Sequence, residues 1–189
     1  MIPGWLTIKA SRCHSDMKRI MIIGSAGSGK STFARKIADI TKLPLIYLDA
    51  YYWKAGWVAT SNDDWEVFQQ GIVLDNEWII DGNYNRTLDI RMARADTIIF
   101  FDLSPWVTMY RVIKRRIQFH GRTRPDLNEG CPEALDWEFI RLVWNFRKLK
   151  RPAILEKLKI FERDKNIIIL RSLREVMNLL DDMKNSSVQ

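Results

Sequence analysis

The sequence has few cysteines, few histidines and no long apolar run. Cys13 and Cys131 lie far apart, so reduced thiols are expected rather than a disulfide framework. Together with His14 and His120 they do not make a four-ligand zinc set. The first 16 residues hold no apolar stretch of signal-peptide length, and no run approaches the roughly 18 apolar residues that span a bilayer. These absences predict a cytoplasmic protein without a membrane partner.

The net charge leaves several classes of function open, whereas the length of the chain limits it to one domain. The chain has 30 Lys and Arg against 23 Asp and Glu, a net charge of +7. Anionic partners are therefore favoured, and nucleotide phosphates satisfy this as well as nucleic acid does. A chain of 189 residues fits one domain. We expect residues 1–16 to be an extension and residues 17–185 a single domain, as a monomer or a dimer.

A phosphate-binding loop, or P-loop, is the strongest motif in the chain. Gly24 and Gly29 are separated by four residues and are followed by Lys30 and Ser31. The apolar run 19–23 before the loop predicts a buried strand, and helical spacing of apolar residues follows it. Glycines let the backbone N–H groups turn toward an anion at the positive end of the helix. Lys30 is expected to reach the β- and γ-phosphates and Ser31 to ligate Mg²⁺.

Apolar runs and helical patterns alternate along the chain. Buried strands are expected at 19–23, 45–48, 78–80, 97–101 and 166–170. Such alternation requires a parallel sheet covered on both faces. The sequence therefore predicts a three-layer α/β domain of the P-loop NTPase fold, with a five-stranded parallel sheet. A helix, a segment bracketed by Gly and Pro, and a second helix between strands four and five predict a helical lid at about 115–140.

Two helix starts carry recognisable signals. Ser104 and Pro105 provide a capping hydroxyl and a proline at the first helical position. We expect the helix that follows to turn one apolar set toward the core: Val107, Tyr110, Ile113 and Ile117. A capping box at 172–175 opens the last helix.

Polar residues at the ends of the second and third strands are the acceptor and metal candidates. Charged groups at the carboxyl ends of parallel strands face the ligand crevice, which favours Asp49 as a site residue. The aromatic stretch 51–57 has two interpretations, as the wall of an acceptor pocket or as packing alone. Asp81 can orient Mg²⁺ through its water shell, and a plain turn at 81–83 is the alternative. The acceptor-binding segment is placed at about 49–76.

The segment from Phe101 to Arg116 resembles that of adenylate kinases, a family of P-loop phosphotransferases. The likeness lies in Phe101-Asp102-Leu103-Ser104-Pro105 followed by Arg111-Val112-Ile113-Lys114-Arg115-Arg116, and in Asp81-Gly82. It implies ATP and Mg²⁺ as cofactors. It also implies that Arg111 stacks on the adenine ring and that Arg115 clamps the phosphates.

Residues 17 to about 180 resemble a closer family, the bacterial DNA topology modulation proteins, through several segments. These are Leu48-Asp49 with Trp53, Ile80-Asp81-Gly82-Asn83-Tyr84, Gly121-Arg122-Thr123-Arg124-Pro125-Asp126 and Glu129-Gly130-Cys131-Pro132-Glu133. The chain departs from nucleoside monophosphate kinases where these place arginines for the acceptor phosphate, since it offers Lys54 and Asn85 there. Asp49 is instead similar to the Asp with which small-molecule kinases of the same fold bind an acceptor hydroxyl.

The expected site residues form four groups. The catalytic group is Lys30, Arg115 and Asp49. The nucleotide group is Gly24, Ser25, Ala26, Gly27, Ser28, Gly29, Lys30, Ser31, Thr32, Arg111, Arg115 and Arg171. The metal group is Ser31 and Asp81, and the acceptor group is Asp49, Trp53, Gly82, Asn83, Tyr84 and Arg91.

These residues support one leading hypothesis and leave two alternatives. The leading one is an ATP- and Mg²⁺-dependent phosphotransferase with a small-molecule or nucleotide acceptor, its charge neutralisation completed by lid arginines among Arg122, Arg124 and Arg141. The first alternative is a nucleotide-switched regulator that binds DNA and alters its topology, although no helix-turn-helix, zinc or basic-arm motif is recognisable. The second is a non-catalytic ATP sensor.

Overall fold

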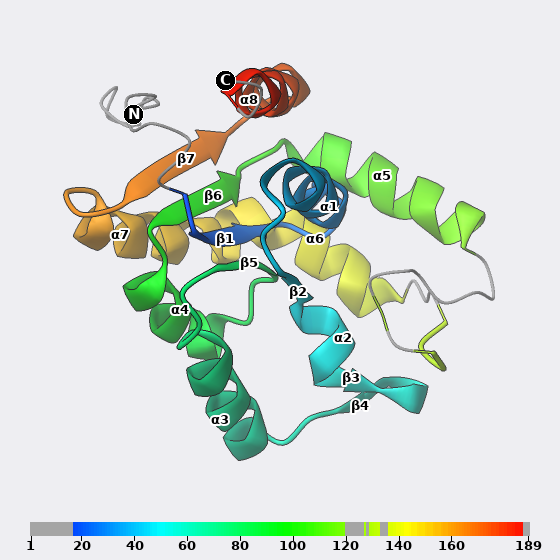
Figure 1. Cartoon of the computed structure of the whole chain (residues 1–189). Coiled ribbons are helices and arrows are strands. Elements are labelled where there is room, and N and C mark those ends of the chain that lie inside the picture. The colour runs from blue at the N-terminus through cyan, green and yellow to red at the C-terminus, as the bar shows by residue number, and fades with distance from the viewer. Residues whose placement is uncertain (1–16, 120–126, 128, 133–135, 187–189) are drawn as a thin grey trace.

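Five parallel strands form the centre of the computed structural model, which describes residues 17–119, 127, 129–132 and 136–186 (Figure 1). They are β1 (Arg19–Gly24), β2 (Leu45–Tyr47), β5 (Trp78–Asp81), β6 (Thr97–Phe101) and β7 (Asn166–Leu170). Their order is β2-β5-β1-β6-β7, and every neighbouring pair is parallel. The first strand of the chain is therefore central, and the P-loop that follows it lies at the middle of the carboxyl edge. The predicted three-layer α/β fold of the P-loop NTPase class is confirmed.

Both faces of the sheet are buried, which explains why its strands are apolar without alternation. On β1, Met21 and Ile23 belong to one core cluster and Ile20 and Ile22 to the other. Successive side chains of a strand point to opposite faces, so each core receives every second residue. All four side chains are fully buried.

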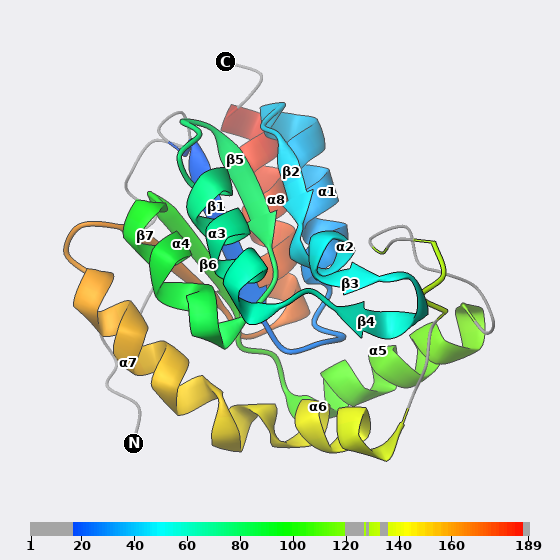
Figure 2. The same cartoon turned by 90° about the horizontal axis from the view of Figure 1, so that it is seen from below.

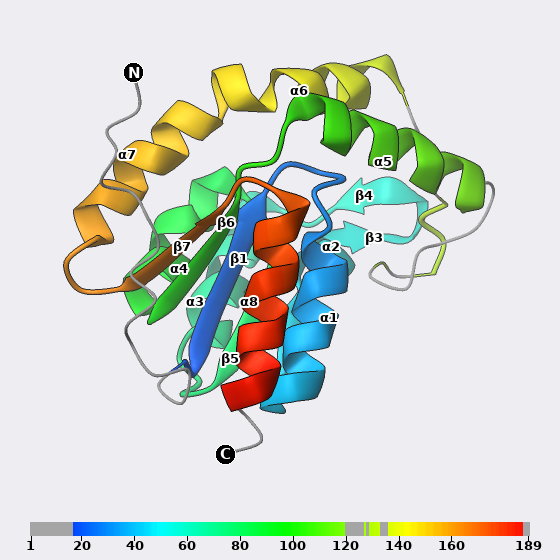
Figure 3. The same cartoon turned by 90° about the horizontal axis from the view of Figure 1, so that it is seen from above.

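Helices cover the two faces as separate layers. On one face lie α1 (Lys30–Thr41) and α8 (Leu173–Ser186), which pack side by side (Figure 3). On the other face lie α3 (Asn62–Ile72), α4 (Leu88–Arg94) and α7 (Arg151–Phe161) (Figure 2). No helix in the described part of the chain has the length and apolarity needed to cross a membrane.

Two groups of elements extend beyond the carboxyl edge of the sheet. The first is α2 (Leu48–Tyr52) with the antiparallel strands β3 (Trp53–Lys54) and β4 (Val58–Ala59). The second is the pair of packed helices α5 (Pro105–Gln118) and α6 (Trp137–Leu149), which lies between β6 and β7 where the helical lid is predicted. The predicted extension at 1–16 and the lid residues Arg122 and Arg124 lie outside the described residues.

The apolar face predicted for α5 is right for Val107, which packs against the core, and wrong for Tyr110, Ile113 and Ile117. Thr108 and Val112 are buried, whereas Tyr110 and Ile117 are exposed by 67% and 73%. The P-loop sets this orientation, because the backbone of Gly27 lies close to the Thr108 carbonyl oxygen and to Val112. Pro105 occupies the start of the helix as predicted, but the Ser104 side chain makes no capping hydrogen bond.

Candidate functional site

The P-loop connects β1 to α1 and depends on glycines with positive φ angles. Gly27 has φ 75° and Gly29 has φ 95°. A Cβ at Gly27 would lie 2.4 Å from the Thr108 carbonyl oxygen, and one at Gly29 would lie 2.8 Å from Arg111 Nη1. Glycine is required here both by conformation and by space. Because α1 begins at Lys30, the unsatisfied N–H groups and the positive dipole end of that helix lie at this loop.

A pocket of about 1230 Å³ lies over the loop and brings most of the predicted site residues together. From the nucleotide and metal groups it is lined by Ala26, Gly27, Ser28, Gly29, Lys30, Ser31, Thr32, Asp81, Arg111 and Arg115. From the acceptor group it is lined by Asp49, Trp53, Gly82, Asn83 and Tyr84. A phosphate loop and a carboxylate thus share one cavity.

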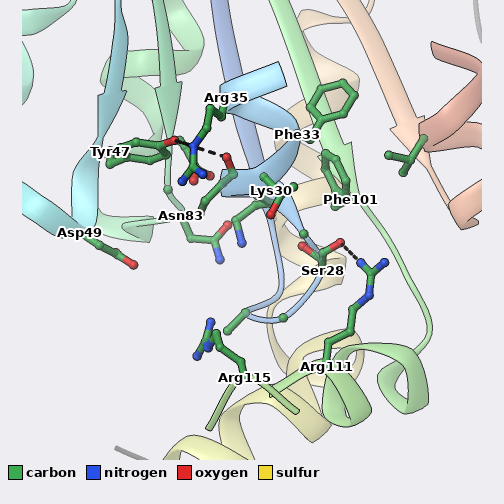
Figure 4. Close-up of a pocket in the computed structure, with 18 of the residues that line it drawn as sticks. Ser28, Lys30, Phe33, Arg35, Tyr47, Asp49, Asn83, Phe101, Arg111 and Arg115 are labelled. Carbon is green, nitrogen blue, oxygen red and sulfur yellow. Dashed lines mark hydrogen bonds between the residues drawn. The ribbon is translucent and has the colours of Figure 1, made fainter. Parts of the chain in front are cut away.

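Three cations surround the loop (Figure 4). Lys30 Nζ donates a hydrogen bond to the Ser25 carbonyl oxygen at 2.9 Å. Arg111 Nη1 donates to the Ser28 carbonyl oxygen, also at 2.9 Å. The Arg115 guanidinium carbon lies 5.9 Å from the centre of the Phe139 ring of α6, a cation–π contact. Positive charge is therefore concentrated where a polyphosphate chain would follow the loop amides.

Asp49 lies on the opposite side of the pocket from Arg111 (Figure 4). The strand predicted to extend to Leu48 ends at Tyr47, and Asp49 lies in the first turn of the short helix α2. The Tyr84 hydroxyl donates to Asp49 Oδ1 at 2.7 Å, which fixes the carboxylate. Burial raises the pKa of Tyr84, and the negative charge of Asp49 raises it further, so the phenol stays protonated and remains a donor.

The aromatic stretch 51–57 contributes both to the pocket and to packing. Trp53 and Trp57 line the pocket and contact one another edge to face, with ring centres 5.4 Å apart. Tyr52 packs instead against Trp65 and Tyr84 beneath the site. Each of the two interpretations from sequence describes part of the stretch.

The residues that follow β5 connect the two ends of the pocket. Asn83 Oδ1 accepts from the Gly24 N–H at 2.8 Å, and Asn83 Nδ2 donates to the Gly24 carbonyl oxygen at 2.7 Å. Tyr84 is next in sequence and holds Asp49. The strand end therefore contacts the P-loop through one residue and the Asp49 carboxylate through the next.

Arg91 does not have the position expected of an acceptor ligand. Its side chain is fully buried and does not line the pocket. The guanidinium donates to the carbonyl oxygens of Gly82, Asn83 and Tyr84. Burial lowers the pKa of Arg91 to about 9, which leaves the group charged at neutral pH. Arg91 supports the loop from beneath instead of facing a ligand.

Four other predicted residues are not in the pocket lining: Gly24, Ser25, Arg141 and Arg171. Gly24 is covered by the Asn83 amide, and Ser25 is buried. The exposed Arg171 donates its backbone N–H to Glu175, a variation on the predicted capping box in which the Ser172 hydroxyl caps Glu175 N. The roles of these residues in binding remain predictions.

Sequence reasoning missed several pocket residues that share a helix face with residues it found. Arg35 follows Ser31 by four positions on α1, and Lys114 follows Arg111 by three on α5, so helical spacing indicates both. An apolar wall on α8, made by Leu173, Val176, Met177 and Leu180, has no comparable signal. It becomes visible only because α8 packs beside α1.

The donor set at the loop fits a magnesium ion. Ser31 offers a hydroxyl and Asp81, 5% exposed at the end of β5, offers a carboxylate. Mg²⁺ takes oxygen ligands, uses few carboxylates and keeps several waters. Among the described residues, no three or more His, Cys, Asp or Glu side chains form a group that could hold a metal by themselves.

Comparison with known proteins gives distant structural likenesses. No family model matches the chain, and no curated protein matches it. A gluconokinase from Sinorhizobium meliloti 1021 is 14% identical, with 90% of this chain and 91% of that chain covered and a TM-score of 0.48. A shikimate kinase from Bacteroides thetaiotaomicron is 17% identical, with 89% and 97% covered and a TM-score of 0.49.

A deoxyadenosine kinase from M. mycoides with bound dCTP is 15% identical, with 88% of this chain and 98% of that chain covered and a TM-score of 0.45. Because all three TM-scores are below 0.5, these likenesses carry no argument about chemistry. The fold assignment rests on the strand order and on the loop after β1.

Proposed function

We propose that this protein is a phosphotransferase that moves the γ-phosphoryl group of ATP to a small acceptor bearing a hydroxyl group. The observation that carries the proposal is the shared pocket, in which the P-loop, the cations of α5 and the carboxylate of Asp49 face one cavity. To catalyse phosphoryl transfer, a protein mainly has to position the reacting groups and neutralise the negative charge of the phosphates. The described residues supply both.

The donor end uses the loop and its cations. Backbone N–H groups of residues 26–31 bind the phosphate chain at the start of α1. Lys30 and Arg115 neutralise charge that develops on the transferred group, and the Arg111 guanidinium packs against the base. Ser31 and Asp81 would hold a Mg²⁺ ion, which would supply further neutralisation of the phosphate charge.

The acceptor end uses Asp49. Its carboxylate accepts a hydrogen bond from the acceptor hydroxyl and takes the proton as the oxygen attacks the γ-phosphorus. The bond from that phosphorus to the β–γ bridging oxygen breaks, and ADP leaves with the electron pair. Tyr84 keeps the carboxylate aimed through its 2.7 Å hydrogen bond, and Trp53 and Trp57 wall the acceptor.

The test is label transfer from γ-labelled ATP to a panel of nucleosides, nucleoside monophosphates and sugars. We expect acceptor-dependent transfer in the wild type, and loss of at least about 100-fold in Lys30→Ala and Asp49→Asn. Asp63→Asn is the matched control, because Asp63 is exposed on α3 and does not line the pocket. Absence of transfer across the whole panel contradicts the proposal, and binding of ATP without transfer favours the sensor.

DNA binding is tested separately by retention on duplex DNA across a salt series. Direct electrostatic binding predicts affinity that falls steeply with salt. We expect no retention near physiological salt, because the cations of α5 that line the pocket have a sufficient role in nucleotide binding.

A further inference from the structure

Arg91 is a buried cation that the proposed reaction does not use. Its side chain is fully buried, and it donates to three consecutive carbonyl oxygens, those of Gly82, Asn83 and Tyr84. Burying a charge is costly unless it is compensated by several hydrogen bonds. An apolar side chain would fill this core position at a lower cost in free energy. The role of the arginine must therefore lie in the three residues whose carbonyl oxygens it binds.

Two of the three residues that Arg91 holds have positive φ angles, which the chain does not adopt readily. Gly82 has φ 145°, and a Cβ there would lie 2.8 Å from Leu48 Cβ. Tyr84 has φ 38° and ψ 72°, a left-handed conformation that is strained for a non-glycine residue. A rigid guanidinium fork that binds all three carbonyls keeps this conformation in place.

The side chains of the same residues contact both halves of the pocket. The Asn83 amide pairs with the N–H and the carbonyl of Gly24, at 2.8 and 2.7 Å, as a second peptide would. The Tyr84 hydroxyl holds Asp49 at 2.7 Å. Gly24 begins the loop that receives phosphate, and Asp49 lies on the acceptor side. Residues 82–84 are therefore a bridge between donor and acceptor, and Arg91 is its support.

We propose that Arg91 is a positioning residue that sets the phosphate loop and the acceptor carboxylate at a fixed separation, acting through Asn83 on one side and Tyr84 on the other. The inference rests on the proposed function, because it concerns the same pocket. Transfer between two bound groups depends steeply on their separation, so a support common to both ends has a direct effect on rate. The guanidinium itself touches neither substrate.

The first experiment measures binding of a non-hydrolysable ATP analogue with Mg²⁺ by calorimetry. Loss of the Asn83 amide in Asn83→Ala is expected to weaken binding roughly tenfold, the value of one to two net hydrogen bonds. Arg91→Lys keeps the charge but not the fork, and is expected to weaken binding about threefold or more. The matched control is Arg94→Lys on the same helix, since Arg94 is exposed and donates to Val73.

A double variant that carries both Arg91→Lys and Asn83→Ala distinguishes a positioning role of Arg91 from simple support of the core. If Arg91 acts through Asn83, the double variant binds the analogue no more than about twofold more weakly than Asn83→Ala alone. Independent effects would multiply, and that result overturns the proposal. A lower melting temperature in Arg91→Lys with an unchanged dissociation constant also overturns it, because Arg91 would then support only the core.

The second experiment uses the acceptor found by the label-transfer panel. Tyr84→Phe is expected to raise the acceptor KM without changing analogue affinity, Asn83→Ala to change mainly analogue affinity, and Arg91→Lys to change both. An Arg91→Lys enzyme with a normal acceptor KM contradicts the bridge. If the wild-type protein does not bind the analogue, the proposed function and this inference are refuted together. If it binds, but the effects of Arg91→Lys and Asn83→Ala on the dissociation constant multiply in the double variant, this inference alone is refuted.

Discussion

Arg111 Nη1 donates a hydrogen bond at 2.9 Å to the carbonyl oxygen of Ser28, 83 positions earlier in the chain. The same guanidinium nitrogen lies 2.8 Å from the position that a Cβ on Gly29 would occupy. The first helix of the predicted lid is thus attached to the P-loop by a charged side chain that also lines the pocket.

Removal of this guanidinium should weaken nucleotide binding. We expect Arg111→Leu to raise the dissociation constant of an ATP analogue about tenfold, because a guanidinium packed on a desolvated aromatic ring contributes up to about 2 kcal/mol. Calorimetry gives the constant directly. Arg116→Leu is the matched control, since Arg116 is on the same helix and does not line the pocket. Equal losses in the two variants would show that net charge matters and the position of Arg111 does not.

Two glycines of the loop should differ in their response to alanine. At Gly27 the new Cβ meets the backbone oxygen of Thr108, which cannot move without displacing α5, and we expect a loss of about 1–3 kcal/mol in unfolding free energy. At Gly29 it meets the end of the Arg111 side chain, which can move away. Gly29→Ala should therefore lose analogue affinity and, because its φ of 95° strains an alanine, some stability, but less stability than Gly27→Ala.

Urea unfolding and calorimetry separate the two outcomes. Gly71→Ala on α3 is the control, because a Cβ there meets nothing within 4 Å and alanine favours the helix. A Gly29→Ala protein that is as destabilised as Gly27→Ala would contradict this account of the loop.

The sheet and the loop could be predicted from sequence because both depend on local patterns. Strands buried on two faces read as continuous apolar runs, and the run 97–101 became β6 with the predicted bounds. The P-loop glycines occupy fixed spacings, so the pocket residues 26–32 followed from the motif.

At the acceptor end five of the six predicted residues line the pocket, and Arg91 does not. Its position could not be predicted because it depends on which way a side chain points in three dimensions. Nothing in the sequence near Arg91 indicates that its guanidinium turns under the loop rather than into the pocket. The exposed face of α5 has the same cause, since Gly27 and not the helix's own pattern decides that Val112 is buried. In both cases the local sequence pattern allows more than one orientation of the side chains, and contacts with residues distant in the sequence determine which one is adopted.

Tyr84 makes the folded state sensitive to alkali. Burial raises its pKa above the ordinary value of 10.0. Below pH 10 the phenol is protonated in both states, whereas above it the unfolded chain loses the proton and the folded protein keeps it. The stability that the buried neutral phenol contributes is therefore complete below pH 10 and declines as the pH rises further, with a limiting slope of about 1.4 kcal/mol per pH unit.

This slope is measurable by urea unfolding between pH 8 and 11. Tyr84→Phe should reduce the decline, while Tyr110→Phe, at an exposed tyrosine of α5, should leave it unchanged. If the two variants decline in parallel, the alkaline loss comes from groups other than Tyr84.

Asp102, directly after β6, anchors the junction between α6 and α7. Its fully buried carboxylate accepts from Arg151 Nε at 2.8 and 2.9 Å, and Arg147 Nε lies 3.5 Å away. Asp102→Ala leaves two cations facing a buried site without their counter-charge, and we expect a loss of about 3–5 kcal/mol in unfolding free energy.

The double variant Asp102→Leu with Arg151→Met should recover a large part of that loss, because apolar groups of similar volume can replace a buried pair. Asp89→Ala is the control, since the Asp89–Lys157 pair is exposed and surface pairs contribute only about 0–1 kcal/mol. Urea unfolding of the four proteins measures these differences. If Asp102→Ala costs no more than Asp89→Ala, the junction of α6 and α7 is held by its apolar contacts, and the position of the α5–α6 pair over the pocket does not depend on this ion pair.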